Sequence, residues 1–186
     1  VKKKYYQKKS LKKTKLLLGN KYNFIQKKKI FKKIKDKNLE KKLNLFIYFG
    51  TKNRSNLVKK ILKKTKNIKI INKIYVINKK KIIPHNIFLE KINTSDLMLI
   101  SSGVTLQECL NMKKMIFATY FSENQKNFYK YYKRRNLIKD LKSFDRFINF
   151  EIKKIHLILK KNQLKIGNYL QNRTNKKKIW SLIKNA

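Results

Sequence analysis

Residues 96–108 read Asp-Leu-Met-Leu-Ile-Ser-Ser-Gly-Val-Thr-Leu-Gln-Glu, and this stretch decides the fold. It begins with an apolar run at Leu97–Ile100, passes through small residues that end at Gly103, and then adopts helical spacing. A short apolar run bounded by a turn is typical of a buried parallel strand. The stretch therefore predicts a strand, a tight loop and a helix that begins at Thr105.

Similar units lie on both sides of this stretch. A short strand is also expected at Leu137-Ile138, and helices are expected from about residue 144 onward, with a break near Gly167-Asn168. Strands that alternate with helices predict an α/β fold with a Rossmann-like, mostly parallel, doubly wound sheet and a helical C-terminal tail. The principal expected strands are Leu45–Phe49, Ile74–Ile77, Leu97–Ile100 and Met115–Ala118, and the helices between them are expected at 54–66, from 105, and at 123–133.

The length of 186 residues suits one domain with a core and is too short for two full α/β domains. We expect a basic linker or arm at residues 1–15, an α/β domain at 16–142, and C-terminal helices at 143–186 that pack on it. No apolar run approaches the roughly 20 residues of a membrane-spanning helix, and no signal peptide is visible. Cys109 is the single cysteine, which excludes a disulfide framework and a cysteine metal site. A cytoplasmic protein fits these features best.

The formal net charge of +42 raises the question of nucleic-acid binding. Nearly all of the basic residues are lysines spread along the whole chain, whereas arginine is the preferred side chain for phosphates and bases. Lys, Asn and Ile share A/T-rich codons, so a biased genome would raise all three together. We therefore favour compositional drift over a specific nucleic-acid site, and expect weak, salt-sensitive attraction to polyanions. Arginine occurs only at positions 54, 134, 135, 146 and 173.

The loop before Thr105 is a candidate diphosphate site. A helix N-terminus at the carboxyl end of a parallel strand offers free N–H groups and the positive end of the helix dipole. The alternative is a simple cap, because Thr105 and Glu108 have the spacing of a capping box. A second loop of the same design follows Phe49, where residues 50–53 read Gly-Thr-Lys-Asn.

A third strand, loop and helix occupies residues 115–125. Asn124 and Gln125 stand at the start of its helix, where their amides are suited to bind sugar hydroxyls. The alternative is again a cap, in which Ser122 or Asn124 only satisfies the first amides of the helix.

Taken in order, these segments resemble the C-terminal half of the family of UDP-2,4-diacetamido-2,4,6-trideoxy-β-L-altropyranose hydrolases of pseudaminic acid biosynthesis. Spore-coat polysaccharide proteins share the pattern, as does the peptidoglycan UDP-N-acetylglucosamine transferase more distantly. The resemblance covers roughly residues 16–140. Its segments are Leu17–Ile25, Phe49–Asn53 with Asn56-Leu57, the Ser-x-Gly-Val-Thr-x-x-Glu motif at Ser101–Glu108, and Glu123–Gln125.

The resemblance implies the C-terminal domain of a GT-B fold, whose task is to hold UDP as water attacks the anomeric carbon of a UDP-sugar. Backbone N–H groups would bind the diphosphate, the Glu108 carboxylate would accept hydrogen bonds from ribose hydroxyls, and Asn124 would be the catalytic residue that contacts the sugar or the water. No metal and no cofactor are implied. The residues implied to bind UDP are Gly50, Thr51, Ser102, Gly103, Val104, Thr105, Glu108 and Gln125.

The chain departs from the family at two points. Thr51 replaces a glycine and Asn53 replaces an aspartate in the first loop. The family's Gly-x-Gly-His motif, whose histidine activates water, has no counterpart here, and we expect His85 and His156 to be structural or incidental. The chain is therefore expected to be a UDP-binding half, which is a fragment, a split half whose N-terminal partner domain is encoded separately, or a decayed remnant. The alternatives are the C-terminal half of a glycosyltransferase, or a basic RNA-binding or ribosomal protein.

Overall fold

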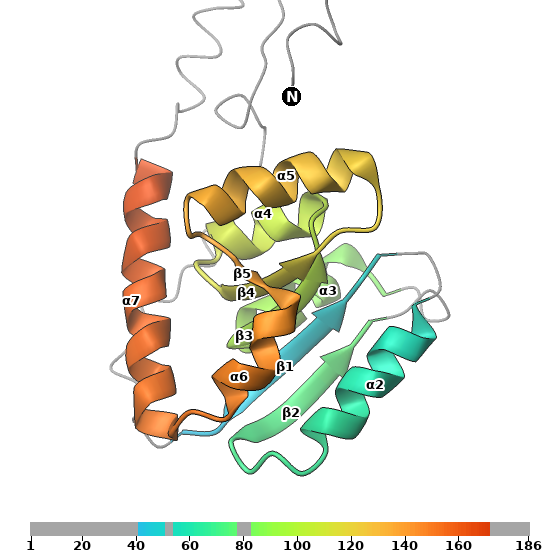
Figure 1. Ribbon diagram of the computed structural model, residues 1–186, viewed down its shortest axis with the longest axis vertical. Coiled ribbons are helices and arrows are strands. Elements are labelled where there is room, and N and C mark those ends of the chain that lie inside the picture. The colour runs from blue at the N-terminus through green and yellow to red at the C-terminus, as the bar shows by residue number, and fades with distance from the viewer. Residues whose placement is uncertain (1–40, 51–53, 78–82, 172–186) are drawn as a thin grey trace, which may run out of the picture.

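A computed structural model describes residues 41–50, 54–77 and 83–171 of the chain. Within these ranges a five-stranded, all-parallel sheet lies between helices (Figure 1). The predicted α/β class with a Rossmann-like parallel sheet is confirmed. The expected arm at 1–15, the segment Leu17–Ile25 and the end of the helical tail lie outside the described residues. The strands are β1 (Leu43–Tyr48), β2 (Ile71–Val76), β3 (Leu97–Ser101), β4 (Met115–Thr119) and β5 (Lys139–Asp140), in the spatial order β2-β1-β3-β4-β5.

Helices cover both faces of the sheet. Three of them, α3, α4 and α5, share a hydrophobic cluster with one face, whereas α2 and α6 share a second cluster with the other. Helix α7 stands beside the layers in Figure 1 and contributes to both clusters, with Ile155 and Leu159 in the second and Ile166 in the first. The helices are α2 (Ser55–Thr65), α3 (His85–Thr94), α4 (Val104–Asn111), α5 (Glu123–Arg134), the 3₁₀ helix η2 (Leu141–Ser143), α6 (Phe144–Ile148) and α7 (Ile152–Gln171).

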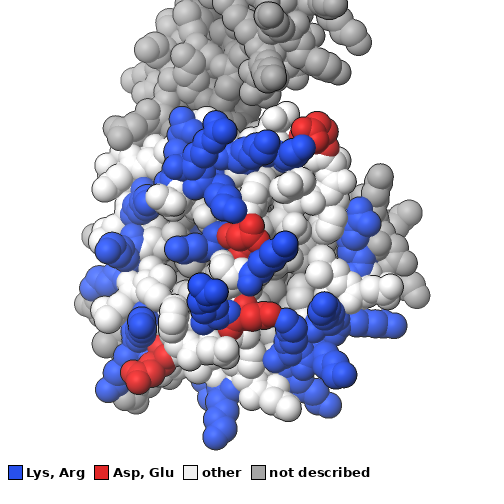
Figure 2. Space-filling model, viewed as in Figure 1, with Lys and Arg blue, Asp and Glu red and all other residues white. Residues whose placement is uncertain are grey.

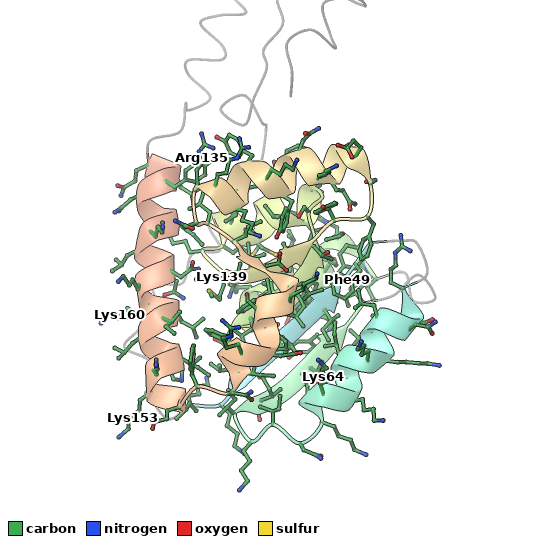
Figure 3. All side chains as sticks on the ribbon, in the orientation of Figure 1. Phe49, Lys64, Arg135, Lys139, Lys153 and Lys160 are labelled. Atoms are coloured by element: carbon green, nitrogen blue, oxygen red, sulfur yellow. The ribbon has the colours of Figure 1, made fainter. Side chains whose placement is uncertain are left out.

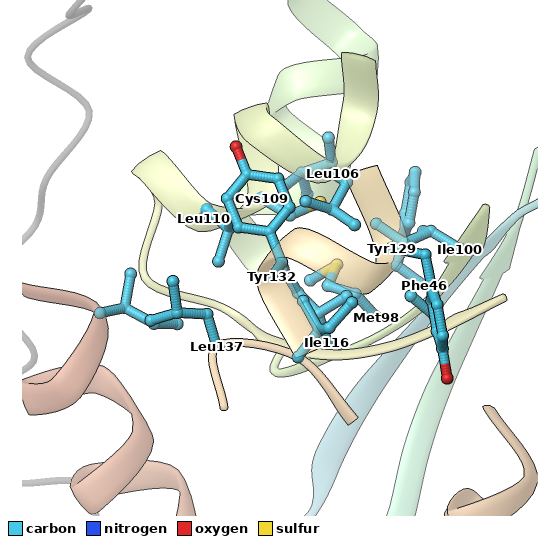
Figure 4. Close-up of a cluster of buried hydrophobic side chains, with 14 of the residues drawn as sticks. Phe46, Met98, Ile100, Leu106, Cys109, Leu110, Ile116, Tyr129, Tyr132 and Leu137 are labelled. Carbon is cyan, nitrogen blue, oxygen red and sulfur yellow. The ribbon is translucent and has the colours of Figure 1, made fainter. Parts of the chain in front are cut away.

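Side chains of the central strands alternate between the two faces. In β1, Phe46 enters the cluster with α3, α4 and α5, whereas Leu45 and Ile47 enter the other. All five side chains of β3 are buried, as expected for a parallel strand covered on both faces. Figure 4 shows the first cluster, in which side chains of α4 and α5 lie against Phe46, Met98 and Ile116 of the sheet.

The four principal predicted strands are present, and their boundaries differ from the prediction by up to three residues. Strand β2 begins at Ile71, three residues before the predicted Ile74. It lies at the edge of the sheet, where polar side chains can be exposed within a strand. The exposed side chains of Asn72 and Lys73 interrupt its apolar pattern. The short last strand is Lys139–Asp140, whereas the predicted pair Leu137-Ile138 is buried and comes just before it.

The predicted break near Gly167 is wrong. Helix α7 continues through this residue, which is buried. A Cβ atom at Gly167 would lie 3.4 Å from Nζ of Lys113, at the close limit of an ordinary van der Waals contact. The glycine therefore lies inside the helix, facing the loop after α4, and does not mark a turn.

None of the helices in the described ranges is long and apolar enough to cross a membrane.

Asp140 joins the short strand β5 to helix α5. The hydroxyl of Tyr129 donates to Oδ2 of Asp140, the Lys133 ammonium lies 3.2 Å from the same oxygen, and the Lys142 N–H donates to Oδ1 at 2.9 Å. Burial raises the pKa of Asp140, but these donors outweigh burial and bring the pKa below its ordinary value of 3.8. The carboxylate form is therefore stabilised by folding.

Replacing Asp140 by asparagine should destabilise the fold more at neutral pH than in acid. A carboxyl group whose pKa is lowered by folding stabilises the native state above its ordinary pKa, and this contribution is lost as the pH falls through the lowered value. The difference in Tm between the two proteins should therefore be largest near neutral pH and shrink below about pH 4. The Asp145→Asn variant, which loses an exposed pair with Lys64, is the control and should show a smaller difference. An Asp140→Asn difference that is the same at every pH would contradict the prediction.

Candidate functional site

The strand order places a topological switch point between β1 and β3. Strand β2, which follows β1 in sequence, lies on one side of β1, and strand β3 lies on the other side of β1. In open α/β sheets, ligands bind beyond the carboxyl ends of the strands at such a point. Because Tyr48 pairs with Ile100 in register, the loops after β1 and β3 leave the sheet side by side.

Gly50 and Ser101 meet at this switch point. Gly50 has φ +86°, in the left-handed region that favours glycine, and a Cβ atom on it would lie 3.8 Å from Oγ of Ser101. Ser101 is only 6% exposed, and no described residue forms a hydrogen bond with its hydroxyl. The two predicted loops therefore lie at one edge of the sheet. Thr51, also predicted to contact the diphosphate, lies outside the described residues.

The N-terminus of α4 has no side-chain cap. Gly103 is the N-cap residue, so the helix begins at Val104, and Thr105 lies inside the first turn. The alternative in which Thr105 and Glu108 form a capping box is therefore wrong, because Thr105 does not occupy the cap position. No described residue accepts a hydrogen bond from the N–H groups of Val104 and Thr105. Val104 is 75% exposed, so this end of the helix is open to solvent.

The residues just before α4 have a different role, because their donors are already used. Ser102 is fully buried, and both its hydroxyl and its N–H donate to the carbonyl oxygen of Thr119, each at 2.9 Å. The N–H of Gly103 donates to the carbonyl oxygen of Ser101 at 2.9 Å. Ser102 therefore fixes the β3–α4 loop against the end of β4. Within the predicted 102–105 stretch, the amides open to a ligand are those of Val104 and Thr105.

Glu108 lies one turn into α4, beside His85 at the start of α3. The distance between Oε1 of Glu108 and Nε2 of His85 is 3.8 Å, and their side chains are 17% and 67% exposed. Burial raises the pKa of the Glu108 carboxyl, and the charge of His85 opposes this shift. The His85 ring also stacks on Phe88, with ring centroids 6.3 Å apart. His85 has no role in the sequence-based prediction, yet the fold brings it next to a predicted site residue.

The two amide side chains at the start of α5 have different surroundings. Oε1 of Gln125 accepts a hydrogen bond from the N–H of Phe121 at 3.0 Å, and its Nε2 lies 4.0 Å from where a Cβ of Gly103 would be. Oδ1 of Asn124 accepts from the hydroxyl of Ser122 and from the N–H of Gln125. Gln125 therefore ties the start of α5 to the loop that precedes it, and its amide lies near the β3–α4 loop. The side-chain NH₂ of Asn124 donates to no described residue.

Two aromatic rings and an arginine come together beside the end of β1. The rings of Phe49 and Phe121 meet edge to face with centroids 6.1 Å apart, and the Arg54 guanidinium lies 4.3 Å from the centroid of Phe121. Figure 3 places Phe49 at the carboxyl end of β1, on the side where α2 begins. Neither Arg54 nor Phe121 is among the site residues predicted from the sequence. The available signal was the rarity of arginine in a chain rich in lysine.

Cys109 and His156 are not available for catalysis, because both side chains are buried. Cys109 is buried in the core, and burial raises the pKa of its thiol well above the ordinary value, so it is a poor nucleophile. His156 is also buried, and its Nε2 lies 2.8 Å from the carbonyl oxygen of Lys41. Within the described ranges no group of three His, Cys, Asp or Glu side chains is arranged to hold a metal ion.

Comparison with known proteins adds no relative to this description. No protein-family model matches the chain, and no curated protein matches it.

Proposed function

We propose that the chain binds the UDP moiety of a nucleotide sugar and is the UDP-binding half of a hydrolase that releases UDP from a diacetamido-trideoxy sugar. The observation that carries this proposal is the uncapped N-terminus of α4 beside Gly50, at the switch point of a parallel sheet. Free N–H groups and the positive end of a helix dipole favour phosphate at such a position. The nucleotide-sugar identity rests on the sequence resemblance, and a cytoplasmic location would follow from it.

Each site residue has a role that its surroundings permit. The amides of Val104 and Thr105 would donate to the diphosphate, and Glu108 would accept hydrogen bonds from ribose hydroxyls through a carboxylate that is partly exposed. The free NH₂ of Asn124 would contact the sugar, while Gln125 holds the loop in place. In a hydrolase this arrangement would stabilise UDP as it departs, without a metal ion.

A glycosyltransferase half would use the same UDP site with a different acceptor. Only product analysis of an enzyme with both domains would separate the two activities, since water and a sugar hydroxyl would both approach from the opposite domain.

The RNA-binding alternative rests on the charge of +42. On the face drawn in Figure 2, lysine and arginine side chains are scattered over most of the described surface, with acidic groups among them. Figure 3 shows Lys153 and Lys160 directed away from the sheet along α7. A dispersed charge of this kind produces weak, salt-dependent attraction to any polyanion and does not indicate a specific nucleic-acid site on this face.

Replacing Glu108 by alanine should weaken UDP binding more than pyrophosphate binding, because ribose contacts are lost and phosphate contacts remain. Loss of hydrogen bonds to a charged group predicts a decrease in UDP affinity of about tenfold or more. Calorimetry at about physiological salt, where the screening length is roughly 8 Å, is the measurement.

The matched control is Glu90→Ala, which makes the same change of charge at an exposed position on α3. It should leave both affinities nearly unchanged. Equal losses for UDP and pyrophosphate in Glu108→Ala would remove Glu108 from the ribose, and tight RNA binding with no UDP binding would favour the RNA alternative.

A further inference from the structure

The Arg54 guanidinium packs on an aromatic ring and forms no ion pair with a described residue. Arg54 is the residue just before α2, and its guanidinium lies 4.3 Å from the ring centroid of Phe121, which is itself 38% exposed. Its Nε atom is buried and forms no hydrogen bond. No described carboxylate lies within ion-pair distance of this guanidinium, although the chain pairs other cations with acidic groups.

A short series of contacts connects Arg54 to the open end of α4. The Arg54 guanidinium lies over the ring of Phe121, the N–H of Phe121 donates to Oε1 of Gln125, and Nε2 of Gln125 lies 4.0 Å from where a Cβ atom of Gly103, the N-cap of α4, would be. Phe121 also contacts Phe49 at the end of β1. Arg54 therefore lies at the same edge of the sheet as Gly50 and the free amides, and an aromatic ring packs against its guanidinium.

We propose that Arg54 binds the phosphate groups of the ligand and gives the site a preference for phosphorylated over unphosphorylated nucleosides. The inference rests on the proposed function, because UDP is the ligand considered. A guanidinium held over an aromatic ring is less free to move, yet its N–H donors, which lie in its own plane, stay free to form paired hydrogen bonds with phosphate oxygens. The terminal NH₂ groups of the guanidinium form no hydrogen bond with a described residue, and they are the donors that a bound phosphate would satisfy.

The test compares UDP and uridine on two substitutions of Arg54. Arg54→Gln should lower the affinity for UDP by about tenfold to a hundredfold, since charge-assisted hydrogen bonds are lost, and should change the affinity for uridine by less than about twofold. Arg54→Lys keeps the charge but loses the planar fork, so its affinity for UDP should be intermediate. Calorimetry with each ligand at about physiological salt gives these values, and circular dichroism verifies the fold.

Two further variants separate a specific contact from general charge. Arg134→Gln removes one positive charge from an exposed position at the last residue of α5 and should leave UDP affinity within about twofold of the wild type. Phe121→Leu removes the ring but keeps the charge, and should lower UDP affinity by less than Arg54→Gln does.

The outcomes distinguish this inference from the proposed function. If the wild-type chain binds UDP and Arg54→Gln binds it equally well, Arg54 does not contact phosphate, and only this inference is overturned. A loss of affinity in Arg134→Gln as large as that in Arg54→Gln would overturn it as well. If the wild-type chain binds no UDP, the proposed function fails and the inference fails with it.

Discussion

Replacing Phe117 by alanine is expected to lower the free energy of unfolding by about 3–5 kcal/mol, a large part of the roughly 5–15 kcal/mol that stabilises a typical domain. Phe117 lies in β4 and is 1% exposed. Its ring contacts Phe144 and Phe147 of α6, with centroids 5.3 Å and 5.0 Å away. The substitution would remove the contact surface between the sheet and α6 and leave a cavity.

Denaturant unfolding of the two proteins measures this change. The control is Leu157→Ala on α7, where the side chain is 61% exposed and the expected change lies within about 0.5 kcal/mol. A Phe117→Ala variant as stable as the Leu157→Ala variant would show that α6 does not cover β4 in solution.

These 186 residues alone are expected to bind UDP weakly and to release no UDP from a UDP-sugar. Adding an N-terminal α/β domain that carries the Gly-x-Gly-His motif should raise turnover by about a hundredfold or more, because a positioned general base and an oriented substrate are both gained. The measurement is UDP release with and without that domain. The control is the same domain with its histidine replaced by alanine. Adding this variant should restore substrate binding but should not produce the full increase in the rate of UDP release.

Turnover by the chain alone would contradict this prediction. If His85→Ala abolished such turnover, the histidine beside Glu108 would be the base, and the proposed requirement for a second domain would be wrong. If His85→Ala left it unchanged, the base would lie elsewhere in the chain.

The central strands are predictable from the sequence because burial on both faces produces a short apolar run that loops and amphipathic helices rarely contain. The predictions at Leu97–Ile100 and Met115–Ala118 agree with β3 and β4 to within one residue. Strand β2 is less predictable, since one edge of it lies open and its exposed Asn72 and Lys73 resemble loop residues. Gly167 misleads the prediction because a sequence does not show whether a helical glycine ends the helix or admits a close neighbour.

The site is predictable in outline and not in its contacts. That the loops at Gly50 and Gly103 lie together follows from parallel strands, whose carboxyl ends share one edge. Local spacing favours a capping box at Thr105, but the helix begins one residue earlier. The neighbours of Glu108 and Phe121 come from distant segments, and local sequence patterns therefore could not place His85 or Arg54 beside them.

The all-parallel sheet also determines how this protein reaches its native state. None of the described strand pairs is a hairpin, and the start of β1 meets the start of β3 through a hydrogen bond from Asn44 to Asp96, which are 52 residues apart. Loop closure over such distances precedes any gain from pairing, so folding should be slower than in a helical bundle of equal size. During synthesis β1 leaves the ribosome before β3 exists, so one side of the future central strand stays unpaired in that interval. In this period a chaperone, or the pairing of β1 with a wrong strand, would have its greatest effect on the yield of folded protein.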